Sequence, residues 1–349
     1  MKNDVTLKQY NIEFLREKAI ESLLKVGVKK ENAYILVDSM LEADICGVHS
    51  HGIRMLPSYI QKCERGEFSY ENPTIEKQTA AFTIVDAKNN IGAVSMNYIT
   101  EVAIKTAMKE GIHTVFSRNA NTFGAGFYYV EKIANASMIG FACCNAPAAM
   151  PAFNGLEAIL GTNPLAFSFP TKSYGNVVMD MATSVVAKSK FGIAKEKGEK
   201  LKEGWALNKD GEPTTDPEEG IKGLVLPMAG FKGYEIAMMI DTLAGFLSGS
   251  GYLNKVGKFY SQTGECMNVG HMVVAFNPKI LYEGDFLTAA DNYIKLIKES
   301  QSIKGQQIII PGENKRKYKR KAMKEGISLP LEVVKKLEFI FKSELKKGE

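Results

Sequence analysis

Apolar residues recur at helical spacing in the first part of the chain. We expect a helix over residues 7–26, with Thr6 as its N-cap. The apolar positions that share one face of it are Phe14, Leu15, Ala19, Ile20, Leu23 and Leu24. A second helix is predicted over residues 31–46, ending at Gly47, and a third over residues 56–65. The N-terminal region is therefore predicted to be helical.

The pattern changes after Asn72-Pro73, a dipeptide that marks a break in regular structure. From about residue 80 to 280, β-rich runs alternate with helical patterns near 93–110, 125–136 and 232–247. The β-rich runs are AFTIVDA, HTVFSRN, MIGFACCN, PLAFSFP, NVVMDMA, LVLPMAG and HMVVAF. Such alternation predicts an α/β domain.

Two further segments complete the predicted organisation. Residues 195–220 are polar, charged and rich in turn residues, and we interpret them as a surface loop or hairpin anchored by Trp205. After about residue 285 the chain is helical again and ends in an apolar stripe formed by Val333, Val334, Leu337, Phe341 and Leu345. We expect residues 1–75 and 285–349 to pack as one helical domain, beside an α/β domain of residues 76–284.

Composition narrows the class of protein. With 45% hydrophobic and 24% charged residues in 349, the chain is neither disordered nor fibrous in type. A formal charge of +5 suits anionic ligands. Five cysteines without a CxxC spacing indicate reduced, buried thiols. The N-terminus lacks an apolar signal core, and no stretch approaches the roughly 18 apolar residues of a membrane span. We therefore expect a cytoplasmic protein.

The run KRKYKRK at residues 315–321 invites a nucleic-acid interpretation. It stands alone in the chain and contains a single aromatic residue, Tyr318. We interpret the run as a solvated helix face and expect neither a nucleic-acid nor a membrane partner.

Candidate chemistry gathers in the turn after the second predicted helix. Ser50-His51-Gly52 and Arg54 place a hydroxyl, an imidazole and a guanidinium group within five residues. Histidine, with an ordinary pKa of about 6.5, can both give and take a proton near neutral pH. His49 and His51 also fit an HxH metal pair, as in a metal-dependent hydrolase, although further ligands are not evident. A purely structural histidine is the other alternative.

The sequence does not indicate dinucleotide binding by a Rossmann fold. Gly124-Ala125-Gly126 precedes a predicted helix, but the third glycine position of GxGxxG is Tyr129. The hydroxyl-rich turns at residues 161–164 and 180–184 offer backbone N–H groups to an anion, and each also suits a helix cap. Lys232 opens an apolar helix, where its charge opposes the helix dipole unless an anion is bound.

Ordered segments along nearly the whole chain carry a family resemblance. They are ADICGVHSHGIRMLPSYI, SRNANTFGAGFYY, NAPAAMPAF, GTNPLAFSFP, DMATSVVAKSK, AGFKGYEIAMMIDTLAGFLSG, NVGHMVVAF, IIIPGE and GISLP. Together they resemble the type 2 malate/L-lactate dehydrogenase family, also called sulfolactate dehydrogenase-like. The resemblance implies NAD or NADP as cofactor, a mixed and largely antiparallel sheet in place of a Rossmann fold, and a homodimer with active sites near the subunit interface.

The same resemblance implies roles for individual residues. His51 is implied as the acid/base, and Asp180 as the carboxylate that orients the imidazole, holds its proton and raises its pKa. Ser50 and Arg54 are implied to bind the substrate carboxylate. The remaining implied contacts are Asn119 and Thr122 beside the substrate, and Gly124, Thr162, Asn163, Asp180, Met181, Ala182, Thr183, Ser184 and Lys232 on the cofactor.

Three positions depart from the family pattern. Relatives place an arginine where this chain has Met55, one residue after Arg54. Several relatives have a second histidine at Thr122, and its absence argues against ureidoglycolate-type chemistry. Ser189 stands in a glycine position of a VARGK-like segment.

We predict an NAD(P)-dependent oxidoreductase that interconverts a small 2-hydroxy acid, such as malate or lactate, and its 2-oxo acid. The alternative is a cyclic-imine reductase acting on piperideine-2-carboxylate or pyrroline-2-carboxylate. The preference between NAD and NADP stays open at this point.

Overall fold

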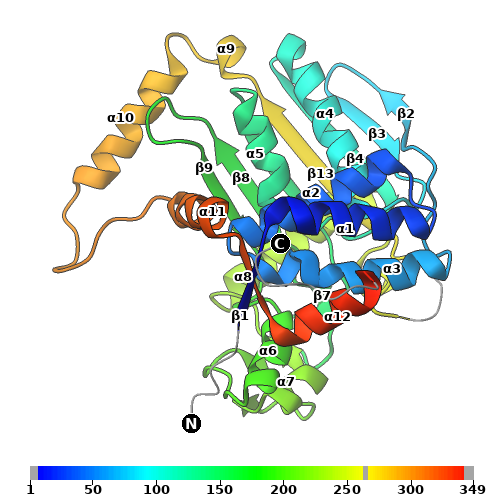
Figure 1. Cartoon of the computed structure of the whole chain (residues 1–349). Helices are drawn as coiled ribbons and strands as arrows, with labels where there is room; N and C mark the ends of the chain where they lie inside the picture. The colour runs from blue at the N-terminus through cyan, green and yellow to red at the C-terminus, as the bar shows by residue number, and fades with distance from the viewer. Residues whose placement is uncertain (1–6, 262–265, 342–349) are drawn as a thin grey trace.

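The computed structural model describes residues 7–261 and 266–341 (Figure 1). The strands are β1 (Leu7–Tyr10), β2 (Thr74–Gln78), β3 (Phe82–Asp86), β4 (Ile112–Ala120), β5 (Ile139–Cys144), β6 (Ala148–Met150), β7 (Leu160–Gly161), β8 (Leu165–Phe169), β9 (Val177–Met181), β10 (Ala206–Leu207), β11 (Pro213–Thr214), β12 (Leu224–Val225), β13 (Val269–Phe276) and β14 (Ile327–Pro330). The α-helices are α1 (Ile12–Lys25), α2 (Lys30–Ile45), α3 (Leu56–Glu64), α4 (Gly92–Glu110), α5 (Phe127–Asn135), α6 (Ser189–Lys197), α7 (Pro217–Lys222), α8 (Phe231–Ile240), α9 (Pro278–Leu281), α10 (Phe286–Glu299), α11 (Glu313–Glu325) and α12 (Leu331–Phe341).

Seven strands form one mixed sheet in the order β2-β3-β4-β13-β5-β8-β9 (Figure 1). Only β3 and β4 are parallel, and α4 supplies the crossover that a parallel pair needs. All other neighbouring strands of this sheet are antiparallel. The prediction of a mixed α/β fold is confirmed.

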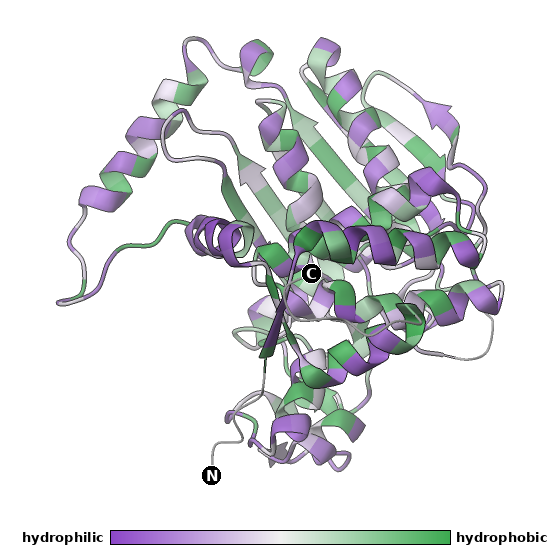
Figure 2. Cartoon of the chain, viewed as in Figure 1, coloured by the Kyte–Doolittle hydropathy of each residue, from purple (hydrophilic) through white to green (hydrophobic). Residues whose placement is uncertain are grey.

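Alternate residues of the central strands serve the two faces of the sheet. In β5, Ala142 and Cys144 join the large core that includes residues of α4 and α5. Cys143, between them, packs instead with Ile240 and Ala244 at the end of α8 and in the π-helical turn that follows it. Figure 2 shows apolar residues along these strands. The sheet is therefore covered by helical structure on both faces.

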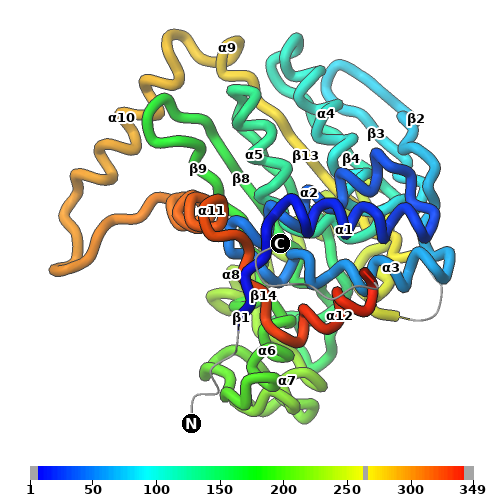
Figure 3. Tube along the Cα trace, in the orientation of Figure 1, coloured from blue at the N-terminus to red at the C-terminus, as the bar shows by residue number. Residues whose placement is uncertain are grey.

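The predicted start of the first helix is wrong. Residues Leu7–Tyr10 form β1, which pairs antiparallel with β14 near the other end of the chain (Figure 3). Helix α1 begins after Asn11, whose side chain accepts hydrogen bonds from the amides of Glu13 and Phe14. The predicted cap, Thr6, lies outside the described residues.

The two ends of the chain lie together. Besides the β1–β14 pair, α1 and α3 contact α12. One large core contains residues of both predicted domains, such as Leu15 and Leu337 from the terminal parts and Val115 from the sheet. The division into a helical domain and an α/β domain stays a prediction.

Residues 195–220 form more than the predicted surface loop. Strands β10 and β11 make the expected hairpin, and β12 joins them in a three-stranded sheet. With α6 and α7 they build a small lobe (Figure 1) that has its own apolar cluster, including Phe191, Leu201 and Ala206. Trp205 packs against this cluster, as an anchor should.

The cysteines of the chain are all free thiols, and Cys266 is half-buried while the other four are buried. The expectation that all five are buried is therefore wrong for Cys266. In the described part of the chain, no helix is both long enough and apolar enough to cross a membrane.

Candidate active site

His51 lies in a tight turn between α2 and α3. Residues His49–His51 form a 3₁₀ turn, and the side chain of His51 is half-buried. Its Nδ1 atom lies 2.8 Å from Oγ of Ser50. The other ring nitrogen, Nε2, has no hydrogen-bond partner within the described residues and is left for a ligand.

A buried carboxylate in α2 anchors this turn. The Asp44 side chain is only 2% exposed, and its Oδ1 lies 2.8 Å from Nδ1 of His49. Its Oδ2 accepts a hydrogen bond from the amide of Ile53 at 2.6 Å. A Cβ atom on Gly52 would lie 2.1 Å from Oδ1 of Asp44, so the glycine of the Ser-His-Gly motif leaves room for the anchor. The sequence did not lead us to Asp44, although a carboxylate inside an apolar helix face was a signal for it.

Asp180 is held by the start of a helix. It lies near the end of β9, and its Oδ2 accepts a hydrogen bond from the amide of Phe127, the first residue of α5, at 3.0 Å. Burial raises the pKa of the Asp180 carboxyl, while the Phe127 amide, Lys315 and His51 act in the opposite direction. The partner that a strand-end carboxylate needs is thus mainly the backbone of α5.

His51 and Asp180 are coupled through space. Burial lowers the pKa of the His51 imidazole, and the negative charge of Asp180 raises it only in part. The expected net rise in the pKa of His51 is therefore wrong, because desolvation outweighs the carboxylate. No hydrogen bond joins the two side chains among the described residues, so the structure does not show the expected contact by which Asp180 would orient the imidazole and hold its proton. The effect that it does show is that of the Asp180 charge on the pKa of His51.

The glycine-bearing segment runs between β4 and α5. Asn119 has a φ of 54° and donates a hydrogen bond from Nδ2 to Oδ1 of Asp86 at 3.0 Å. The carbonyl of Thr122 passes close to the start of α4, because a Cβ on Gly92 would lie 2.1 Å from it. Gly124 has a φ of 86° and faces open space, so its backbone is accessible to a ligand.

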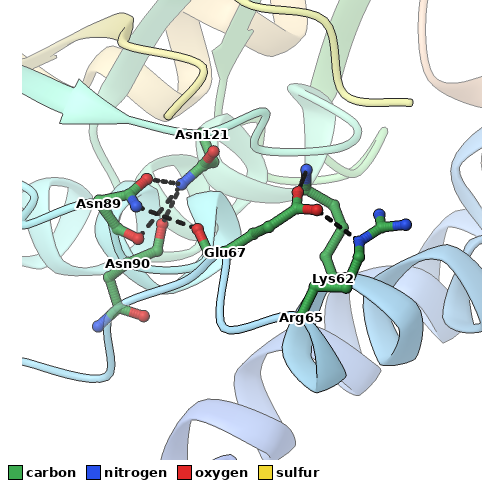
Figure 4. Close-up of polar contacts among 6 residues, drawn as sticks. All are labelled: Lys62, Arg65, Glu67, Asn89, Asn90 and Asn121. Carbon is green, nitrogen blue, oxygen red and sulfur yellow. Dashed lines mark hydrogen bonds and ion pairs between the residues drawn. The ribbon is translucent and has the colours of Figure 1, made fainter. Parts of the chain in front are cut away.

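A buried polar network positions this segment relative to α3 (Figure 4). Nδ2 of Asn121 donates to Oδ1 of Asn89 and to the carbonyl of Asn90, each at 2.9 Å. Asn89 in turn donates to the carbonyl of Glu67 at 3.0 Å. The Glu67 carboxylate is buried and forms an ion pair with Lys62 in α3. The helix that follows the Ser-His-Gly turn is thereby fixed to the Asn119–Gly124 segment.

Three of the segments predicted to contact the cofactor meet in the structure. The amide of Thr183 donates to the carbonyl of Thr162 at 3.1 Å, and the Thr183 carbonyl accepts from Met228 at 2.8 Å. A Cβ on Gly233, next to Lys232, would lie 2.6 Å from the Thr183 carbonyl, so the start of α8 packs directly on this strand end. One region is therefore formed by the turn at residues 161–164, the strand end at residues 180–184, and Lys232.

This region has free polar groups that suit a phosphate-containing ligand. The hydroxyl of Thr183 is buried without a hydrogen-bond partner. Lys232 is exposed in the first turn of α8, a helix with no side-chain cap. Met181 is 43% exposed at the end of β9 and Ala182 is half-buried beside it. An anionic dinucleotide fits such a group of donors.

Two of the predicted cofactor residues are occupied within the protein. Asn163 is fully buried, accepts from the Ala146 amide at 2.9 Å and donates to the Ala237 carbonyl at 2.8 Å. The Ser184 hydroxyl donates to the carbonyl of Val186 at 2.8 Å. Their side chains hold the turn and the strand end in place.

Relatives carry an arginine at the position of Met55, and this chain has Arg54 one residue earlier. Of these two positions, only Arg54 offers a positive charge to a substrate carboxylate. It is half-buried and takes part in no ion pair within the described residues, although its charge acts on Asp44, His49 and Tyr260. The neighbouring Met55 accepts a hydrogen bond from the Tyr260 hydroxyl through its sulfur at 3.3 Å. The one-residue displacement of the arginine thus leaves a free guanidinium group three residues after His51.

His49 is engaged by Asp44, and 59% of its side chain is exposed. Across residues 7–261 and 266–341, no group of three or more His, Cys, Asp or Glu side chains is placed to hold a metal ion.

The geometry agrees with comparisons to known proteins. A profile of the malate/L-lactate dehydrogenase family matches residues 10–338. The chain belongs to this family. It is 35% identical over 327 residues to the malate/(S)-sulfolactate dehydrogenase of Methanothermus fervidus, covering 93% of this chain and 95% of the relative. It is 30% identical over 319 residues to the (2R)-3-sulfolactate dehydrogenase (NADP(+)) of Chromohalobacter salexigens, covering 91% and 94%.

A solved structure gives the same result for the fold. The sulfolactate dehydrogenase from Methanocaldococcus jannaschii superposes with a TM-score of 0.89 at 34% identity, covering 97% of this chain and 98% of that chain. Membership of the malate/L-lactate dehydrogenase family confirms the prediction of an NAD(P)-dependent dehydrogenase that acts on a CH–OH group.

Proposed function

We propose that His51 and Asp180 form the proton-transfer centre of an enzyme that interconverts a small 2-hydroxy acid and its 2-oxo acid. The observation that carries this proposal is the placement of His51. Its ring is half-buried, Nδ1 lies at Ser50, Nε2 has no partner in the part of the chain that the structure describes, and the charge of Asp180 acts on it. Malate and sulfolactate, named for the relatives, and lactate are the substrates that we propose to test first.

Each proposed role follows from the contacts of the residue. Because burial lowers the pKa of His51, the neutral ring can accept the hydroxyl proton of the substrate at Nε2. The negative charge of Asp180 stabilises the imidazolium that forms. Arg54, which forms no ion pair in the described structure although its charge acts on Asp44, binds the substrate carboxylate. The amide side chain of Asn119 and the backbone at Thr122 border the substrate. In the reverse direction the protonated ring returns its proton to the developing alkoxide.

The cofactor is proposed to lie across the region of Thr162, Thr183 and Lys232, with its reactive end near Gly124. NAD or NADP, when bound, accepts or supplies the hydride. The unpartnered Thr183 hydroxyl, the uncapped start of α8 and the exposed Lys232 favour its phosphates. Because the sheet is largely antiparallel and GxGxxG is absent, we propose that the dinucleotide is held without a Rossmann fold.

We also propose a cytoplasmic homodimer. The free thiols suit a reducing compartment. Exposed apolar side chains on α10 and the segment after it, including Leu296 and Ile303, suit a partner subunit.

The function is tested with the purified full chain in a panel of 2-oxo acids, each with NADH and with NADPH. We expect oxidation of one cofactor with oxaloacetate, pyruvate or sulfopyruvate. Faster turnover of a cyclic imine would favour the reductase alternative, and inactivity of folded protein across both panels would contradict the proposal.

The His51→Ala variant tests the proton-transfer role. We expect a loss of turnover of about 100-fold to 10,000-fold, the usual contribution of a general acid or base. The affinity for NADH, measured by its fluorescence, is expected to be unchanged, because His51 holds no part of the proposed dinucleotide region. Turnover at the wild-type rate would exclude His51 as the acid/base.

A further inference from the structure

The basic run at residues 315–321 is not a uniformly solvated helix face. Lys317, Arg320 and Lys321 are exposed on α11, as predicted. Lys315 and Arg316 are half-buried, contrary to the prediction. Figure 2 shows the strongly hydrophilic α11 lying against the body of the molecule. One face of the basic helix is therefore used within the protein.

That face contacts α2 and the residues that lead from it into the Ser-His-Gly turn. Lys319 forms an ion pair with Glu42 of α2 at 2.5 Å. The ring of Tyr318 packs on Gly47, where an added Cβ would lie 2.9 Å from Cδ2 of the ring. Gly47 is three residues before Ser50, so α11 borders the start of the Ser-His-Gly turn.

The same face contacts the elements that carry Asp180. Arg316 donates a hydrogen bond to the carbonyl of Asn176, just before β9. The Nζ atom of Lys315 lies 5.2 Å from the centre of the Phe127 ring, a cation–π contact. The amide of this same Phe127 donates to Asp180. Phe127 therefore connects Lys315 with the Asp180 carboxylate, whose charge acts on His51.

The positive charge of Lys315 is available to act on the Asp180 carboxylate. Lys315 takes part in no ion pair within the described residues, and the carboxylates that feel its charge are Asp180 and Glu131. The titratable groups that face Asp180 are Lys315 from α11, His51 from the turn and the Cys144 thiol from β5. Lys315 is the one ammonium group among these neighbours.

We propose that Lys315 is a positioning residue of the active site, whose ammonium group, held on the Phe127 ring, keeps the Asp180 carboxylate charged and so assists proton transfer at His51. This inference rests on the proposed function. It assigns to Lys315 a supporting role in catalysis, where the sequence was interpreted as a solvated helix face.

The test compares Lys315→Met with Lys321→Met, a matched change on the exposed face of the same helix, where Lys321 forms an ion pair with Glu325 and with no other described residue. The rate of 2-oxo acid reduction is measured against pH. Without Lys315 the Asp180 carboxylate binds a proton more readily. We therefore expect the acidic limb of the rate profile to move to higher pH by on the order of half a pH unit, which is about a threefold loss of rate on that limb. Lys315→Arg should restore the wild-type limb, and Lys321→Met should leave it in place.

A second readout separates this role from others. We expect the dissociation constant for NADH, measured by fluorescence, to be the same in wild type and Lys315→Met. A raised dissociation constant with an unmoved acidic limb would overturn the proposal in favour of direct cofactor binding, and coincident profiles would overturn it outright. If Lys315→Met does not fold, as judged by circular dichroism, Lys315→Gln replaces it. An inactive wild type would refute the proposed function instead, so the two failures are distinguishable.

Discussion

The glycine of the Ser-His-Gly turn is required by packing. Gly52 has an ordinary φ of −82°, so the backbone alone does not demand glycine. A Cβ atom there would lie 2.1–2.2 Å from three atoms of the buried Asp44 carboxylate. Because Asp44 also holds His49 and the Ile53 amide, withdrawing it would break these hydrogen bonds. The turn and its anchor are therefore a single packed unit.

We expect Gly52→Ala to lower the free energy of unfolding by about 1–3 kcal/mol, the usual cost of overpacking, and to reduce turnover by displacing His51. Urea unfolding and steady-state rates measure the two effects. Gly192→Ala is the matched control, because a Cβ on Gly192 of α6 meets nothing within 4 Å. We expect that control to be neutral or stabilising by about 0.5–1 kcal/mol. Equal stability of Gly52→Ala and wild type would show that Asp44 is not a fixed anchor.

At the residue scale, the sequence singled out His51 by its residue type and neighbours, and the family resemblance added Asp180 and Arg54. These site assignments stay predictions. The sequence did not single out Asp44, or Lys315 for the role that we propose, because both depend on contacts that local patterns do not reveal. The net direction of the His51 pKa shift was also missed, since it depends on how deeply the folded chain buries the ring.

At the scale of elements, a buried ion pair joins the end of α3 to the loop that follows it. The side chains of Lys62 and Glu67 are 3% and 2% exposed, and Arg65 adds a second contact to Glu67 at 2.5 Å. Lys62 also lies 5.3 Å from the centre of the Phe259 ring. Figure 4 shows Glu67 between the side chains of Lys62 and Arg65 and the asparagines Asn89, Asn90 and Asn121. Because water does not reach the Lys62 ammonium or the Glu67 carboxylate, each charge is stabilised by the other.

We expect Lys62→Met to lower the free energy of unfolding by about 3 kcal/mol, because it leaves the buried Glu67 carboxylate short of its main partner. The double variant Lys62→Met/Glu67→Leu should recover much of this loss, since an apolar pair of similar size needs no charge compensation. Urea unfolding at neutral pH measures both. Equal losses in the single and the double variant would contradict the account.

The ion pair between Lys62 and Glu67 also predicts that the stability of the fold depends on pH. Burial raises the pKa of the Glu67 carboxyl, but the contacts with Lys62 and Arg65 outweigh burial and hold the pKa below its ordinary value. A depressed pKa in the folded state means that the contribution to stability is complete above the ordinary glutamate pKa of about 4.3 and is lost as the pH falls through the folded value. We expect Glu67→Gln to flatten the acid side of the stability profile, measured by thermal unfolding from pH 3 to pH 7. An unchanged slope would exclude Glu67 as a source of acid sensitivity.

Elements with strong local patterns were predicted to within a few residues, and those that depend on distant partners were not. Helices α2 and α4 follow the predicted ranges because their apolar periodicity is long. Residues Leu7–Tyr10 were predicted as helix because nothing local shows that Ile327–Pro330 pairs with them. The β10–β11 hairpin and a β-rich run containing β12 were predicted, but their assembly with α6 and α7 into one lobe was not, because strands of two residues do not reveal their partners.

At the scale of the whole molecule, α10 and residues 300–310 form an arm that extends from the edge of the sheet (Figure 3). Its inner side is fixed, because Ile294 and Ile310 pack with Val177 of the edge strand β9. Its outer side carries large apolar residues, with Leu296 71% exposed and Ile303 73% exposed. An apolar surface of this kind on an ordered arm suits a second copy of the chain.

We expect the wild-type chain to be a dimer in light scattering coupled to size-exclusion chromatography, and Leu296→Glu to shift it towards monomer. A buried charge at the interface is costly unless it is paired, so one glutamate in each subunit weakens association. The shift from dimer to monomer should appear first on dilution. Phe339→Glu is the matched control, since Phe339 on α12 is 84% exposed and lies away from the arm in the sequence and in the fold. A monomeric wild type, or a control that dissociates as readily as Leu296→Glu, would contradict this assignment of the arm. If the active sites lie near the interface, dissociation of Leu296→Glu should also reduce turnover in parallel with the fraction of monomer, which ties the arm to catalysis.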